Sequence, residues 1–116
     1  VFLLASILVY PCFEIVRSLL YRFLNKTSLM LPDNNHLHNY VNNYLLMFDL
    51  NKHIANSVTG LFLAILTSAP SLILFFSNYS GIKYIWLILF AFQIIILSIM
   101  YMYFSKKINR LTHSLL

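Results

Sequence analysis

Acidic residues are scarce in this sequence, which has three Asp or Glu against eight Lys or Arg in 116 residues. Its one cysteine, Cys12, excludes an internal disulfide and a zinc site made from a cysteine cluster. Charged residues make up 9% of the chain, whereas a soluble globular domain has about 25%. These shortages argue against an ordinary soluble domain, and no nucleic-acid partner is expected.

Long hydrophobic runs are what the sequence has instead. Hydrophobic residues make up 60% of the chain, and its mean hydropathy is +0.78. Residues 55–77 and 84–105 carry no charged side chain, and each run reaches the roughly 20 residues that an α-helix needs to cross a bilayer. A soluble chain of 116 residues has too little interior to bury two such helices. The sequence therefore predicts an all-α fold with integral membrane helices.

The first ten residues, VFLLASILVY, are apolar but too short to span a bilayer. They have no preceding basic segment and no following small-residue cleavage site, so they do not fit a signal peptide. Because the chain starts at Val1 rather than Met, we expect residues 1–10 to be the end of a truncated membrane helix. The chain would then be the C-terminal part of a larger membrane protein, with the earlier helices as its partners.

The positions of the positive charges predict the topology. Four Lys or Arg lie in residues 11–54 and three follow residue 105, whereas only Lys83 accompanies the expected turn at residues 78–81. Cytoplasmic segments of membrane proteins carry such an excess of positive charge. We therefore expect residues 11–54 and the basic tail, residues 106–116, to lie on the cytoplasmic side of a multi-pass protein.

Two residues interrupt the apolar runs. Pro70 lies within the first run, where either a packing kink or a substrate-lining kink would explain it. Gln93 lies within the second run and is expected to hydrogen-bond a neighbouring helix.

Residues 11–26, PCFEIVRSLLYRFLNK, alternate polar and apolar side chains with the period of an α-helix. Such an amphipathic helix after a membrane segment is expected to lie in the membrane interface, with Glu14 and Arg17 paired at i,i+3. Two interpretations of its cationic face stay open. The face either anchors the chain to anionic lipid headgroups, or it holds a phosphorylated lipid or nucleotide sugar through Arg17, Arg22 and Lys26.

A polar segment, LPDNNHLHNYVNN at residues 31–43, follows this helix. Asp33 is a suitable N-cap and predicts a short helix that carries His36 and His38 near its start. Apolar residues recur at helical spacing after it and would pack inward, namely Leu37, Tyr40, Val41, Tyr44, Leu45 and Phe48.

The two histidines have several possible roles. A shared zinc ion is disfavoured because residues at i and i+2 of a helix point about 200° apart, and His53 is too distant to be assigned as a further ligand. A nucleophile–base pair lacks a positioned nucleophile. An anion site fits better, because a helix N-terminus and imidazole groups offer hydrogen-bond donors. A solvated loop with incidental histidines is the remaining alternative.

The residues from Tyr10 to Val41 resemble the C-terminal cytoplasmic region of the polyprenyl-phosphate N-acetylhexosamine-1-phosphate transferases, in particular the bacterial undecaprenyl-phosphate N-acetylglucosamine-1-phosphate type. Two membrane helices after the motif also resemble that branch. The family pattern runs from Pro and Phe through Asp/Glu, paired Arg and Ser to Pro-Asp-Arg-x-His-Leu-His-His. The matching positions here are Pro11, Phe13, Glu14, Arg22, Ser28, Pro32, Asp33, His36, Leu37 and His38.

The resemblance implies an enzyme of the bacterial cytoplasmic membrane. Such enzymes transfer a sugar 1-phosphate from a UDP-N-acetylhexosamine to polyprenyl phosphate, release UMP, and initiate lipid-linked polysaccharide synthesis with Mg²⁺ as cofactor. By the same resemblance, His36 and His38 would contact the nucleotide sugar, Asp33 would cap and position their loop, and Arg22 would face the diphosphate or the lipid phosphate.

The sequence departs from the family pattern at three positions. Asn39 stands where the final His is expected and is kept as a candidate substrate-binding residue, Asn34 replaces an Arg, and Tyr21 replaces the first of the paired arginines. The family's paired-aspartate motifs are also missing. We therefore expect the Mg²⁺ ligands to lie outside this chain and the 116-residue chain alone to have no transferase activity.

A non-enzymatic membrane protein is the alternative. It would be a transporter fragment or an assembly subunit whose basic helix binds membrane lipid. The sugar that an enzyme would use and the oligomeric state stay open, and a homo-oligomer is one possibility.

Overall fold

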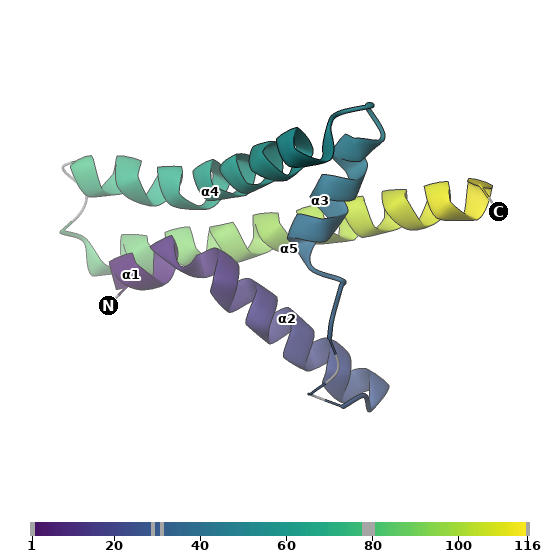
Figure 1. The fold of residues 1–116 in the computed structure, drawn as a ribbon. Coiled ribbons are helices and arrows are strands. Elements are labelled where there is room, and N and C mark those ends of the chain that lie inside the picture. The colour runs from purple at the N-terminus through teal and green to yellow at the C-terminus, as the bar shows by residue number, and fades with distance from the viewer. Residues whose placement is uncertain (1, 29, 31, 78–80, 116) are drawn as a thin grey trace.

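The computed structural model describes residues 2–28, 30, 32–77 and 81–115, and this part of the chain is helical with no strand. Its elements are α1 (Phe2–Ile7), α2 (Val9–Asn25), α3 (Leu37–Leu46), α4 (Lys52–Phe76) and α5 (Lys83–Leu115) (Figure 1). The predicted all-α class is confirmed. Of the expected turn at residues 78–81, positions 78–80 lie outside the described residues.

Helices α4 and α5 form the predicted hairpin of long apolar helices. Residues Lys52–Phe76 and Tyr84–Leu115 are each long and apolar enough to cross a membrane. Helix α5 has 33 residues, which corresponds to about 50 Å of helix at 1.5 Å per residue. The basic tail, expected as a separate segment from residue 106, is therefore the last part of the same helix.

Small and polar side chains line the inner side of α4. The buried positions recur every fourth residue, at Ala55, Thr59, Leu63, Thr67 and Ser71. Gln93 of α5 donates from Nε2 to the carbonyl oxygen of Thr67 at 2.7 Å and to Oγ of Ser71 at 3.3 Å. The predicted hydrogen bond from Gln93 to a neighbouring helix is thereby confirmed.

Pro70 lies inside α4, close to these contacts. With Gln93 it lines a cavity of about 20 Å³ between α4 and α5. A cavity of this size holds about one water molecule. The structure therefore favours the packing interpretation of Pro70 over a substrate-lining one.

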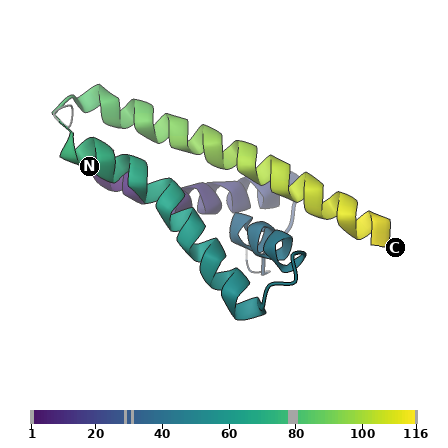
Figure 2. The same ribbon diagram turned by 90° about the horizontal axis from the view of Figure 1, so that it is seen from above.

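The break between α1 and α2 lies at Leu8, where the backbone has φ −90° and ψ 15°. Pro11, for which either an early helix position or a break was expected, is the third residue of α2. The missing N–H of a proline costs nothing there, because the first N–H groups of a helix have no partner within it. Helix α1 packs against α4 and α5, and α2 then diverges from the hairpin (Figures 1 and 2).

Helix α3 packs against both helices of the hairpin (Figure 2). The core cluster unites α2, α3, α4 and α5 through Val9, Leu37, Val41, Leu63 and Leu97. The inward packing predicted for the apolar side of α3 is confirmed for Leu37 and Val41. It is wrong for Phe48, which is 60% exposed, because α3 ends at Leu46.

Helix α2 has an exposed apolar face and an inward polar face, the reverse of a surface helix on a soluble protein. From residue 15 onward its large apolar side chains are between 50% and 82% exposed, namely Ile15, Val16, Leu19, Leu20, Phe23 and Leu24. Its polar side chains Glu14, Arg17 and Ser18 instead face the segment before α3. This orientation suits a helix whose outer face meets lipid, and it brings the polar face to the candidate site.

Candidate functional site

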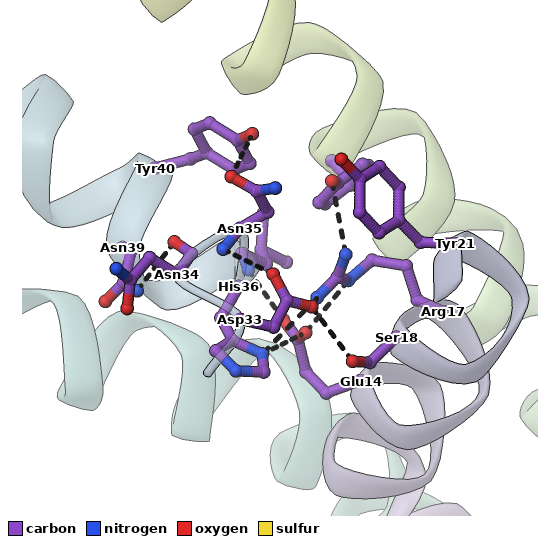
Figure 3. A network of polar contacts seen from close by, with 12 residues as sticks. Glu14, Arg17, Ser18, Tyr21, Asp33, Asn34, Asn35, His36, Asn39 and Tyr40 are labelled. Carbon is purple, nitrogen blue, oxygen red and sulfur yellow. Dashed lines mark hydrogen bonds and ion pairs between the residues drawn. The ribbon is translucent and has the colours of Figure 1, made fainter. Parts of the chain in front are cut away.

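A polar cluster joins α2 to the segment before α3 (Figure 3). The guanidinium of Arg17 donates from Nε to Oε2 of Glu14 at 3.1 Å and from Nη2 to Oδ2 of Asp33 at 3.0 Å. The hydroxyl of Ser18 donates to the same Asp33 oxygen at 2.9 Å. The side chains of these three charged residues are at most 10% exposed. The i,i+3 pair predicted for Glu14 and Arg17 is confirmed.

Glu14 stabilises the start of α3 from a different helix. Its Oε1 accepts a hydrogen bond from the backbone N–H of Leu37 at 2.6 Å, and its Oε2 lies 2.9 Å from Nδ1 of His36. The N-cap residue is His36, which makes no side-chain cap of its own. Without Glu14, the backbone N–H of Leu37 would be buried and unpaired. Glu14 therefore acts as the N-terminal capping side chain of α3.

The prediction that Asp33 is the N-cap of this helix is wrong. Helix α3 begins at Leu37, four residues later, and Asp33 lies in the preceding loop. Its Oδ1 accepts from the backbone N–H of Asn35 at 2.8 Å, the contact of an Asx turn. Asp33 therefore shapes the loop that leads to His36 and fixes this loop to Arg17.

The guanidinium of Arg17 is held by protein side chains and is not open to a phosphate. Besides its two carboxylate partners, its Nη1 donates to the hydroxyl of Tyr101 on α5 at 3.3 Å, and its Cζ lies 5.0 Å from the centre of that ring. These contacts neutralise the guanidinium and join α2 to α5. They give no support to the phosphate contact predicted for Arg17.

The cluster favours the charged form of Asp33. Burial raises the pKa of the Asp33 carboxyl, but the hydrogen bonds from Asn35, Ser18 and Arg17 outweigh it, so the pKa is below its usual value. At Arg17, burial lowers the pKa, but the hydrogen bonds to Glu14 and Asp33 raise it overall. Burial also raises the pKa of the neighbouring Tyr40 to about 12, so this phenol is neutral at physiological pH.

The lowered pKa of Asp33 makes the stability of the cluster sensitive to acid. Because the folded state holds the Asp33 proton less tightly than the unfolded state, the stabilisation is complete above the unfolded pKa of about 3.9 and is lost as pH falls through the lower folded pKa. We expect the thermal midpoint in detergent to fall more steeply in this acid range for the wild type than for Asp33→Asn. Parallel profiles for the two proteins would contradict this assignment.

His36 and His38 point to different parts of the molecule. His36 meets Glu14, whereas Nε2 of His38 lies 2.8 Å from Oδ1 of Asn56 on α4. Among the described residues, no group of three His, Cys, Asp or Glu side chains is placed to hold a metal ion. His36 and His38 therefore have separate partners on α2 and α4.

The acidic residues of the cluster do not fit a magnesium site. Both oxygens of Glu14 accept hydrogen bonds, from Leu37 and from Arg17. Both oxygens of Asp33 accept as well, from Asn35 and from Arg17 with Ser18. A magnesium ion needs carboxylate oxygens in octahedral geometry, and each of these four already accepts a hydrogen bond from the protein.

Arg22 lies where three cavities meet. The largest, about 710 Å³, is an open groove along α2 with mostly apolar walls, lined by Leu19, Leu20, Arg22, Phe23, Lys26 and Thr27. A second, about 320 Å³, extends from Arg22 to Glu14, Ser18 and His36. A third, about 250 Å³, is polar and includes Asp33, Asn34 and Asn35. Arg22 thus borders an apolar groove, a mostly apolar cavity that reaches Glu14 and His36, and a polar cavity.

The remaining predicted residues support this arrangement in different ways. Lys26 ends α2 in the left-handed conformation, with φ 51°, and its side chain lines the apolar groove. Asn39, at the position of the final family His, donates from Nδ2 to the carbonyl oxygen of Asn34 at 2.9 Å. The Asn39 side chain therefore stabilises the loop before α3 and does not point into a cavity.

Two contributors to this site were not predicted from the sequence. One is the capping role of Glu14, and the other is Tyr101, a residue of a membrane-helix run. Glu14 is the only acid in the amphipathic helix, which was a signal that it had a particular partner. Nothing local in the sequence marks Tyr101.

The chain matches no model of a known protein family, no curated protein and no solved structure. The interpretation of the site therefore depends on its residues and contacts.

Proposed function

We propose that the chain supplies the substrate-binding part of a membrane transferase that moves N-acetylhexosamine 1-phosphate from a UDP-sugar to polyprenyl phosphate. In this reaction an oxygen of the lipid phosphate attacks the β-phosphorus of the UDP-sugar. The bond from that phosphorus to the bridging oxygen breaks, and UMP leaves with the bridging oxygen. The resemblance of residues 10–41 to such enzymes motivates this proposal.

The position of Arg22 is the observation that carries the proposal. A polyprenyl phosphate has a long apolar chain and an anionic head, and a nucleotide sugar is polar throughout. The groove along α2 offers apolar side chains to the first, with Lys26 beside it, and the cavities with His36, Asn34 and Asn35 offer hydrogen-bonding groups to the second. Arg22 borders both and would neutralise phosphate charge where the two substrates meet.

His36 would act as a hydrogen-bond donor to the nucleotide sugar. Glu14 fixes its Nδ1 side, and the imidazole, whose side chain is 41% exposed, borders the cavity shared with Arg22. His38 is directed to Asn56 and would have a smaller role. The Mg²⁺ that the resemblance implies would have its ligands outside this chain, because Glu14 and Asp33 do not fit it.

A non-enzymatic lipid-binding protein is the second candidate. The exposed apolar face of α2 favours it, since membrane contact alone explains that face. It does not explain why a cavity bordered by Glu14, Arg22 and His36 adjoins the groove. The two candidates therefore differ in whether His36 matters for a reaction.

The test measures UMP release from UDP-N-acetylglucosamine and polyprenyl phosphate in membranes that contain the complete protein. We expect turnover in the wild type and a loss of about ten- to a hundredfold for His36→Ala, the value of a hydrogen bond to a charged group. His53→Ala is the matched control, because His53 is exposed at the start of α4 and borders none of these cavities. No UMP release from the wild type, or equal rates for both variants, would favour the second candidate.

A further inference from the structure

We propose that the C-terminal part of α5 binds the phosphate of an anionic phospholipid headgroup through Lys106, Lys107 and Arg110. These residues lie outside the cluster around Arg17 and outside the three cavities that Arg22 borders. The site is therefore independent of the proposed transferase reaction. Its ligand is a structural lipid of the surrounding membrane.

Two tyrosines hold the side chain of Lys107 in place. Its Nζ donates to the hydroxyl of Tyr44 on α3 at 3.1 Å and to the hydroxyl of Tyr103, one turn earlier on α5, at 3.3 Å. The same nitrogen lies 4.5 Å from the centre of the Tyr44 ring and 5.5 Å from that of Tyr103. An ammonium group has three N–H donors, so these two bonds leave a third for a ligand.

The three cations border one cavity. It has a volume of about 280 Å³ and is lined by Tyr103, Lys106, Lys107 and Arg110. Lys106 and Arg110 are exposed and lie one helical turn apart, and Lys107 lies between them in the chain. A phosphate group in this cavity could accept hydrogen bonds from all three side chains, and the Arg110 guanidinium presents the planar donors that suit it.

The described residues supply no carboxylate partner for the positive charge of this site. Lys106 and Arg110 are like charges at i,i+4, a spacing that destabilises a helix. Residues 50–116 contain no Asp or Glu. Among the described residues, no salt bridge includes Lys106, Lys107 or Arg110. An external anion would remove the repulsion between these cations.

The position of the site along α5 selects a lipid as the source of this anion. The apolar run of α5 ends in Tyr101, Tyr103 and Phe104, immediately before Lys106. Tyrosine rings concentrate at the level of lipid headgroups, and Lys or Arg next to a membrane helix attract anionic lipids. The cations therefore begin where the phosphates of the bilayer are expected.

The experiment titrates lipids onto the full chain in a neutral detergent and counts bound lipids by native mass spectrometry. We expect phosphatidylglycerol to bind at least tenfold more tightly than phosphatidylcholine. Arg110→Gln should weaken phosphatidylglycerol binding about fivefold, the value of one cation at a membrane surface. Tyr44→Phe keeps every charge but releases Lys107, and it should weaken binding about threefold. Circular dichroism verifies that both variants fold.

Lys52→Gln is the matched control, because it removes the same charge from the exposed first residue of α4. It should leave phosphatidylglycerol binding unchanged. Equal loss for Lys52→Gln and Arg110→Gln would show a diffuse charge effect and overturn the proposal. Unchanged binding in Tyr44→Phe, equal affinity for the two lipids, or displacement of the lipid by inorganic phosphate would also overturn it.

Discussion

Replacing Glu14 with alanine is expected to lower the free energy of unfolding by about 3–5 kcal/mol, the cost of removing one partner from a buried ion pair. Three groups lose their acceptor together, namely the Arg17 guanidinium, the His36 ring and the Leu37 N–H. The measurement is equilibrium unfolding in mixed micelles, followed by far-UV circular dichroism. A loss below about 1 kcal/mol would contradict the capping role of Glu14.

A matched pair of isosteric variants separates this role from a general charge effect. Glu14→Gln and Asp49→Asn each remove one negative charge without a change in shape. Asp49 is exposed and has φ 57°, a conformation that asparagine tolerates. We expect Asp49→Asn to be neutral and Glu14→Gln to be destabilising, though less than Glu14→Ala because the amide oxygen still accepts from Leu37. The double variant Glu14→Ala/Arg17→Ala should lose less than the sum of the single losses.

Replacing Arg22 with glutamine is expected to reduce kcat/KM of the complete protein about 10²–10³-fold, as removal of a group that stabilises transition-state charge does. The physical reason is the place of Arg22 between the apolar groove and the cavities that His36, Asn34 and Asn35 border, where the phosphates of both substrates would meet. The measurement is UMP release at varied concentrations of UDP-sugar and of polyprenyl phosphate.

The separate kinetic constants test how Arg22 acts. A fall in kcat would mean that Arg22 acts in the transition state, whereas a rise in KM for polyprenyl phosphate alone would mean that it only binds the lipid. Lys52→Gln, with the same change of charge, should retain wild-type activity. Activity of Arg22→Gln within about threefold of wild type, a loss smaller than that of one hydrogen bond, would refute the assigned role.

Local patterns in the sequence predicted the helices well. The uncharged runs at residues 55–77 and 84–105 correspond to α4 and most of α5. These two helices were predictable because the length of each run and its lack of charge can be read from the sequence. The polar–apolar period of residues 11–26 became α2. The partner of Gln93 was also predictable in kind, because an isolated polar side chain in an apolar helix needs a hydrogen bond from a neighbour.

The contacts between helices were not predictable in the same way. Asp33 has the chemistry of an N-cap, but the loop before α3 is extended and the cap is Glu14, 23 positions before the N–H that it accepts from. Arg17 looked like a phosphate ligand because its partners Asp33 and Tyr101 are distant in sequence. Helix propensity depends on residues that are close in the sequence. The roles of Glu14, Asp33 and Arg17 depend instead on which helices and loops pack together.

The composition of the core has a consequence for the order in which the protein matures during synthesis. The cluster that holds α3 contains Val9, near the beginning of this chain, and Leu97, near its end. When the ribosome has added residues 37–46, the carboxylate of Glu14 is already present. Helix α5, against which α3 packs, has not yet been synthesised. The histidine-bearing segment must therefore wait for about fifty further residues before it can dock, a delay of several seconds at about 5–20 residues per second. Arrival of α5, rather than of the segment itself, would complete the site.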